Sequence, residues 1–197
     1  WLERASVNLK YDSARAVCKF ALLVSSHDTI PDSNNPGLMK KGHKGVAVYF
    51  DYVHWSSSDL KTIEHVAPQS DGNSGWDKEI YREQLEHSVG NLTLLPTSIN
   101  SSVGNRSWEE KEIYFRHLAK KDEVELLRIR DEAANKGIVL SAETLELLTG
   151  ATYANHVAPI VALSSSVGEP KWDRNLIENR ARRICDLLWD HVEPWLK

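Results

Sequence analysis

The sequence predicts a mainly α-helical domain of the α+β class, with a small strand–strand–helix unit embedded near its middle. Two short segments favour strands. In residues 62–66, Ile63 and Val66 flank a Glu-His pair and Pro68 prevents the strand from continuing; in residues 92–95, three leucines precede Pro96. Pro96 then suits the first turn of a helix. Elsewhere, apolar residues recur at the three- and four-residue spacing of a helix face.

The first part of the chain is expected to form a helix, a loop and a strand. The helix is predicted from an apolar stripe, with Asp12 or Ser13 as its cap. The stripe consists of Ala14, Val17, Cys18, Ala21 and Leu22. Residues 25–45 are rich in Ser, Asp, Asn, Pro and Gly and are predicted to be a loop. Residues 46–55 are rich in β-branched and aromatic side chains, which favours a strand, with a helix as the alternative.

An insert, residues 70–88, separates the two central strands. It opens with a loop over 71–75, and a charged helical pattern then runs from Trp76 to His87. We expect Trp76 to pack this helix onto the core.

Helices are predicted over most of the remaining chain. Capping-box patterns at Ser107 and Asp122 begin two of them, and Gly137 can end the second. A third helix is expected over 141–150, followed by a stretch over 151–168 that is loop-like apart from a short apolar run. A last, long amphipathic helix has an apolar face made of Ile177, Ala181, Ile184, Leu188, Val192 and Trp195.

Composition limits the class of protein. With 41% hydrophobic residues, the 197-residue chain can bury one good core. Its formal net charge of −4 argues against a strong standalone nucleic-acid binder, because Lys and Arg normally neutralise the phosphates. Cys18 and Cys185 lie on predicted apolar helix faces without metal-ligand spacing, so we expect buried, reduced thiols and a cytoplasmic location. No apolar run is long enough to predict a membrane span.

Four polar residues stand at the ends of the predicted central elements: Glu64, His65, Asn91 and Asn100. Hydrolysis of a phosphodiester needs a base to activate water and a cation to offset charge on the phosphate. His65 suits the first task because its usual pKa of about 6.5 leaves it largely neutral at physiological pH. Glu64 and Asn100 offer the oxygen ligands that Mg²⁺ or Mn²⁺ prefers. Taken singly, each would be an ordinary histidine or turn residue.

In this order, these residues resemble the ββα-metal, or HNH, nuclease motif. The closer resemblance is to the HNH domain of GmrSD-type restriction and antiphage proteins. It is carried by Ile-Glu-His-Val-Ala-Pro-Gln at 63–69, Gly-Asn-Leu-Thr-Leu-Leu-Pro at 90–96, and Asn100, Asn105 and Lys111. Ala67 is small where a larger aliphatic residue is common, and Glu64 replaces the Asp of several HNH branches, but neither change removes a required group.

The resemblance implies a role for each polar residue. His65 would be the general base, and Glu64 and Asn100 would hold a divalent metal, Mg²⁺ before Mn²⁺. Asn91 would tie the loop together and orient His65 through its carbonyl. Asn105 and Lys111 match downstream family positions, although a turn and a solvated helix face explain them equally well.

Further residues are candidates for contacts around this centre. His87 precedes Asn91 closely enough in the chain to touch the centre; the alternative is that its charge serves only the C-terminal end of a helix. The candidates for DNA-backbone contacts are Lys40, Lys41, Lys44 and Arg106. The alternative for the lysines is a solvated loop. The last helix also carries arginines that either keep its surface soluble or contact the DNA backbone: Arg174, Arg180, Arg182 and Arg183.

The expected function is metal-dependent endonucleolytic cleavage of DNA in restriction or antiphage defence, with nicking as the outcome of one centre. The alternatives are an inactive helical interaction or effector-binding module and an RNA-cleaving nuclease of the same motif. The start at Trp1 in mid-pattern suggests a fragment, and the resemblance implies that an N-terminal sensing or NTPase-like region lies in the same protein or in a partner subunit. The expected divisions are 1–61, an N-terminal helix and loop region, 62–120, the nuclease core, and 121–197, a C-terminal helical region.

Overall fold

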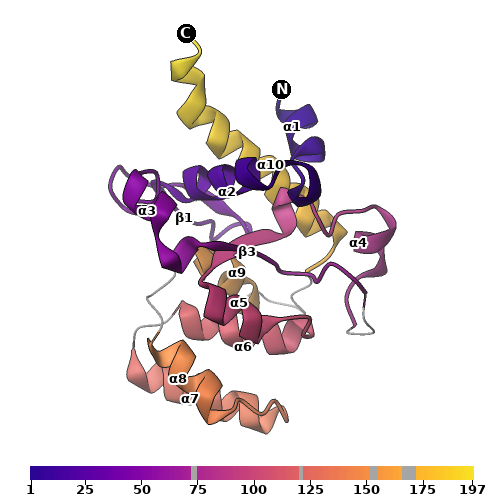
Figure 1. Cartoon of the computed structure of the whole chain (residues 1–197), viewed down its shortest axis with the longest axis vertical. Coiled ribbons are helices and arrows are strands. Elements are labelled where there is room, and N and C mark those ends of the chain that lie inside the picture. The colour runs from indigo at the N-terminus through magenta and orange to yellow at the C-terminus, as the bar shows by residue number, and fades with distance from the viewer. Residues whose placement is uncertain (72–74, 120–121, 151–154, 166–171) are drawn as a thin grey trace.

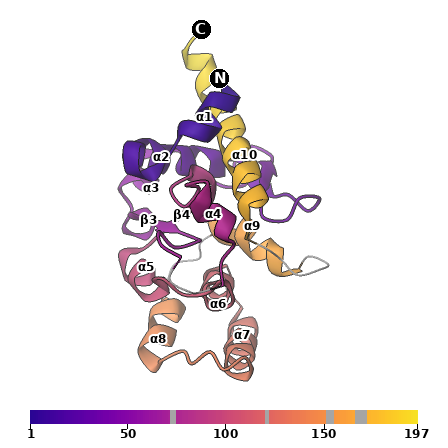
Figure 2. The same ribbon diagram turned by 90° about the vertical axis from the view of Figure 1, so that its right-hand side faces the viewer.

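The computed structural model describes residues 1–71, 75–119, 122–150, 155–165 and 172–197. This part of the chain is mainly helical and carries two separate two-stranded sheets, which confirms the mainly α-helical α+β class. Both termini lie at one end of the molecule, and helices α7 (Glu123–Asn135) and α8 (Ala142–Gly150) lie at the other (Figures 1 and 2).

The N-terminal segment forms α1 (Leu2–Asn8) and α2 (Tyr11–Ser26). The predicted amphipathic helix is therefore confirmed, but its predicted cap is wrong, because Lys10 holds the N-cap position and no side chain caps the helix. Ala14 has non-helical dihedral angles, and this kink rotates the stripe, so that Val17 is 50% exposed.

Two predictions for residues 25–55 are wrong. The expected loop contains a hairpin of β1 (Thr29–Pro31) and β2 (Met39–Lys41), whose strands are too short to give a visible alternation. The expected strand over 46–55 is irregular and ends in α3 (Tyr52–Ser56). Tyr52 and other apolar side chains there are exposed, so their β propensity did not indicate a buried strand.

The predicted central unit is confirmed. After η1 (Ser58–Leu60), strand β3 (Thr62–His65) pairs antiparallel with β4 (Leu92–Leu95), and α5 (Thr97–Val103) follows Pro96. The register places His65 opposite Leu92. The chain therefore leaves β3 directly beside the point where it enters β4.

The insert between these strands is less helical than predicted. Its only described α-helix is α4 (Lys78–Arg82), and the 3₁₀ turn η2 (Val89–Asn91) leads into β4. Gln84 has a φ of 54°, in the left-handed region, which ends the helical path before His87. Trp76 is buried, as expected.

The capped helices after the central unit are confirmed. Ser107 accepts a hydrogen bond from the Glu110 backbone at the start of α6 (Trp108–Leu118), and Asp122 caps α7 in the same way. The stretch predicted to be loop-like apart from a short apolar run is largely helical over 155–165, so the loop prediction is wrong outside that run; 151–154 and 166–168 lie outside the described residues. The last elements are η3 (Asn155–Val157), α9 (Ala158–Val161), η4 (Ala162–Ser165), α10 (Arg174–Val192) and η5 (Glu193–Trp195).

The β3–β4 pair contributes to two hydrophobic clusters. On one side, Ile63, Leu92 and Leu94 pack with residues of α2 and α10; on the other, Leu95 packs with residues of α5 and α6. The first cluster draws on all three expected divisions. Cys18 and Cys185 are buried and free, as predicted. No helix among the described residues is long and apolar enough to span a bilayer.

Candidate functional site

Strand β3 carries the predicted polar residues on its two faces. Because side chains alternate along a strand, Thr62 and Glu64 share one face, and Ile63 and His65 share the other. The first face looks toward α5 and α6, and the second toward α2. Within the described residues β3 pairs only with β4, so its other edge has no strand beside it.

Glu64 forms a buried ion pair with Lys111 of α6. The Lys111 Nζ lies 2.6 Å from Glu64 Oε1 and donates a second bond, of 2.8 Å, to the His65 carbonyl oxygen. Burial raises the pKa of Glu64 and lowers the pKa of Lys111, and their mutual attraction opposes both shifts. Lys111 is therefore not on a solvated face; it fixes the carboxylate and the end of β3.

His65 is nearly buried and contacts a second histidine. Its Nε2 lies 3.3 Å from Nδ1 of His87, and its ring meets the Tyr11 ring edge-on at 4.7 Å between centroids. Its Nδ1 makes no hydrogen bond to a described residue. Burial, with smaller effects of His87 and Lys111, lowers the pKa of His65 to about 4. The ring is therefore neutral at pH 7 and can accept a proton.

Asn91 is fully buried, and both ends of its amide are occupied. Its Oδ1 accepts from the Ala67 backbone and from Trp172 Nε1, each at 2.8 Å. Its Nδ2 donates to the carbonyls of Ala67 and Glu86, also at 2.8 Å. These bonds tie the loop together as expected. The expected orientation of His65 is not seen, because the Asn91 backbone carbonyl accepts instead from Val66.

Helix α10 supports the turn that carries Asn91. A Cβ on Gly90 would overlap the carbonyl oxygen of Ile177, so only glycine allows this close approach. Arg180 Nη1 donates to the carbonyls of Gly90 and Leu92, and its guanidinium lies 5.1 Å from the centre of the Trp172 ring.

Arg180 is only 2% exposed, so for this residue both the solvated and the DNA-contact interpretations are wrong. Sequence reasoning missed Arg180 and Trp172 as supports because their partners lie about 80 to 90 positions away. No local pattern signals such contacts; the helical stripe marks only apolar neighbours.

Asn100 presents its amide differently. Its Nδ2 donates to Thr62 Oγ1 at 2.9 Å and to the Ile63 carbonyl at 3.2 Å. A carbonyl can only accept, so the nitrogen must face β3. The Asn100 Oδ1 makes no hydrogen bond to a described residue. Because Thr62 shares a face with Glu64, the amide of Asn100 lies on the same side of β3 as that carboxylate.

The donor set on this face fits a hard divalent cation. Glu64 supplies a carboxylate and Asn100 an amide oxygen, both of the type that Mg²⁺ prefers. The described residues hold no group of three or more His, Cys, Asp and Glu side chains able to bind a metal. An ion here would therefore depend on Asn100 and complete its shell with water and phosphate oxygens.

The remaining predicted residues lie apart from this centre, except His87. Asn105 is exposed in the turn after Gly104 and makes no contact with the centre among the described residues. Arg106 donates to the Ser102 carbonyl at 3.0 Å. Lys40 and Lys41 lie on β2, in the other sheet.

Lys41 pairs with Asp190 at 2.9 Å on the surface, and Lys44 is exposed in the loop that follows. The structure thus does not bring these lysines to β3, and their contact with DNA stays a prediction.

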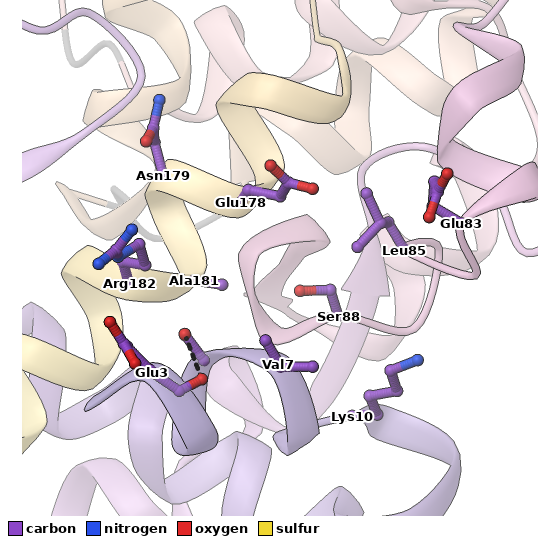
Figure 3. A pocket seen from close by; sticks show the side chains of 11 residues that line it. Glu3, Val7, Lys10, Glu83, Leu85, Ser88, Glu178, Asn179, Ala181 and Arg182 are labelled. Carbon is purple, nitrogen blue, oxygen red and sulfur yellow. Dashed lines mark hydrogen bonds between the residues drawn. The ribbon is translucent and has the colours of Figure 1, made fainter. Parts of the chain in front are cut away.

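A cavity of about 400 Å³ lies elsewhere, between α1, the loop after α4 and α10 (Figure 3). Glu3, Glu178 and Arg182 are among its lining residues, so both signs of charge meet there. Lys10 and Ser88 also border it. None of the four central polar residues lines this cavity.

Comparison with models of protein families assigns the chain to a family. A family model described as "GmrSD restriction endonucleases, C-terminal domain" matches residues 46–187. The match includes β3, β4, α5 and α6, and therefore every polar residue of the centre and Lys111. No match was found among curated proteins.

Proposed function

Because the chain belongs to the family of GmrSD restriction endonuclease C-terminal domains, we propose that it is a metal-dependent HNH-type endonuclease that cuts DNA in restriction or antiphage defence. One observation carries the proposal. Among the described residues, an imidazole nitrogen of His65 and the amide oxygen of Asn100 have no hydrogen-bond partner, and both lie at the strand that carries the fixed carboxylate of Glu64.

Glu64 and Asn100 would hold the ion, Mg²⁺ or alternatively Mn²⁺. When bound, the ion would offset the charge that develops on the phosphate oxygens. Lys111 keeps the Glu64 carboxylate at the end of β3, and α5 keeps the Asn100 nitrogen turned toward β3. Two protein ligands leave positions for water and for the phosphate.

His65 would act as the general base. Its Nδ1 would take a proton from the attacking water, the new P–O bond would form as the P–O3′ bond breaks, and the 3′ oxygen would take a proton from solvent. Burial lowers the pKa of His65 to about 4, so at pH 7 the ring is neutral and one nitrogen has a lone pair for the proton. One centre per chain would cut one strand, so nicking is the expected product.

DNA is the proposed substrate and partner. The net charge of −4 supports a further proposal, that an N-terminal sensing or NTPase-like region, in the same protein or a partner subunit, supplies recognition and much of the affinity. The cut itself would then require only local contacts around β3.

The test is conversion of supercoiled plasmid to open circles with Mg²⁺, Mn²⁺ or EDTA. We expect nicking with either metal, none with EDTA, and a loss of about a hundredfold or more for His65→Ala, the range of general-base catalysis. His54→Ala is a matched control, because His54 pairs with Asp51 away from the centre. Metal-independent cutting, or equal cutting by both variants, would contradict the proposal.

A substrate competition completes the test. Labelled single-stranded RNA and double-stranded DNA are offered together at equal concentration with Mg²⁺. Preferential cutting of DNA supports the proposed substrate. Preferential His65-dependent cutting of RNA would overturn the substrate while leaving the chemistry intact.

A further inference from the structure

The imidazole of His65 needs a partner that fixes its orientation, and Asn91 is not that partner. Every polar atom of the Asn91 side chain is engaged by Ala67, Glu86 or Trp172. The described residue that does bond to the His65 ring is His87, through its Nδ1.

The backbone around His87 is held firmly. The His87 carbonyl accepts from the Tyr11 backbone nitrogen at 2.8 Å, which ties it to the start of α2. The preceding carbonyl, of Glu86, accepts from Asn91, and Val89 donates to Leu9 at 3.0 Å. Because bonds on both sides fix this loop, the His87 ring is presented to His65 in one position.

The ring of Tyr11 limits the motion of both histidines. It meets His65 edge-on, and it lies nearly parallel to His87, with 6.2 Å between centroids and 14° between planes. The two imidazoles are themselves close to perpendicular, at 81°. Such an arrangement selects one ring rotation of His65, in which Nε2 points at His87.

The hydrogen bond between the two rings needs one donor and one acceptor. In a neutral imidazole one nitrogen carries the proton and the other accepts, and a bond at one nitrogen sets the state of the other. If His65 Nε2–H donates to His87 Nδ1, then His65 Nδ1 must be an acceptor. The reverse arrangement would protonate His65 Nδ1 and remove the lone pair that a base needs.

We propose that His87 is a positioning residue for His65, accepting from its Nε2–H and thereby keeping its Nδ1 as the proton acceptor. This inference rests on the proposed role of His65 as the base. The role differs from catalysis itself, because His87 acts on the reaction only through His65. The contacts of the Tyr11 ring with both imidazoles help to hold them in this relative orientation.

Three substitutions at His87 test the proposal by where they place a polar atom. His87→Asn puts an amide atom close to the former Nδ1, His87→Gln puts one near the former Nε2, and His87→Leu supplies none. We expect kcat for plasmid nicking to fall about tenfold or more in the Leu and Gln variants, with KM little changed, as when an orienting partner is lost. The Asn variant should recover most of the loss.

A purely structural role would not separate Asn from Gln, since both are polar and similar in size. Equal activity of the Asn and Gln variants at matched melting temperatures would therefore overturn the proposal. A loss confined to KM would also contradict it, because positioning of the base affects the chemical step.

Nitrogen NMR of the His65 ring at pH 7, without DNA, gives a readout that needs no cutting. We expect the Nε2–H form in the wild type and the Asn variant, and a mixture of tautomers in the Leu variant. The same tautomer distribution in all three would overturn the inference. A shifted tautomer in a protein that cuts nothing would support the positioning role while rejecting the proposed nuclease function.

Discussion

Asn91 and Asn100 are the same residue type in one motif, yet the structure uses them in opposite ways. Asn91 is fully buried in the turn that enters β4, and all of its hydrogen-bonding atoms have partners. Asn100 is partly exposed on α5, and among the described residues only the nitrogen of its amide has a hydrogen-bond partner. The difference separates a residue that maintains the fold of the site from one whose oxygen is available to a ligand.

The residues packed around Asn91 and Asn100 differ in the same way: those around Asn91 are more numerous and more tightly packed. The turn of Asn91 is crowded by the backbone of α10 against Gly90, by Arg180 of α10 and by Trp172, which precedes that helix. Among the described residues, the Asn100 side chain is hydrogen-bonded only to Thr62 and Ile63 of β3. The tightly packed residues therefore surround Asn91, whereas the oxygen of Asn100 is left as a possible metal ligand. Such a division suits a site that must admit a phosphate.

The largest effect should follow Asn91→Ala. It would leave the Ala67 amide and carbonyl, the Glu86 carbonyl and Trp172 Nε1 without their partner. At about 1 kcal/mol or more for each buried unsatisfied group, we expect a loss of about 4 kcal/mol in the free energy of unfolding, measured by urea denaturation. A loss below about 1 kcal/mol would remove the distinction between the two asparagines.

A smaller loss of folding stability is expected at acid pH, through the histidine that is hydrogen-bonded to β4. His156 Nε2 donates to the Leu94 carbonyl at 2.6 Å, and burial lowers the pKa of His156 to about 4. In the unfolded chain His156 becomes protonated below about pH 6.5, whereas in the folded chain it becomes protonated only near pH 4. Stability from this group is therefore complete above pH 6.5 and is lost as the pH falls to about 4, by up to about 3 kcal/mol.

His65 should add a loss of the same sign, since its pKa is lowered in the same way. The variant His156→Gln isolates the first contribution. Urea denaturation at pH 7 and pH 4.5 should show a smaller pH-dependent loss in this variant than in the wild type. An unchanged difference between the two pH values would show that His156 does not titrate as described.

The sequence predicted those parts of the site that depend on neighbours along the chain. Strands β3 and β4, the proline before α5 and the cap at Ser107 are local patterns, and all are observed. The helix predicted to reach His87 failed because Gln84 adopts a left-handed conformation that its residue type does not announce.

The missing parts depend on contacts between distant segments. Lys111 reaches Glu64 from 47 positions away, and Trp172 reaches Asn91 from 81. A lysine on a charged helix gives no sign that it is buried, and neither does Arg180 among the other arginines of α10. The direction of each amide, which distinguishes Asn91 from Asn100, is decided by these contacts.

The most direct measurement is binding of Mn²⁺ in the absence of DNA, followed by the electron paramagnetic resonance signal of the free ion. Asn100→Ala should weaken binding about tenfold or more, while costing only about 1 kcal/mol of stability, because Thr62 and Ile63 lose one amide donor. Asn179→Ala, an exposed asparagine of α10, should bind as the wild type does. Equal binding by wild type and Asn100→Ala would contradict the assignment of Asn100 as the ligand at the centre of this account.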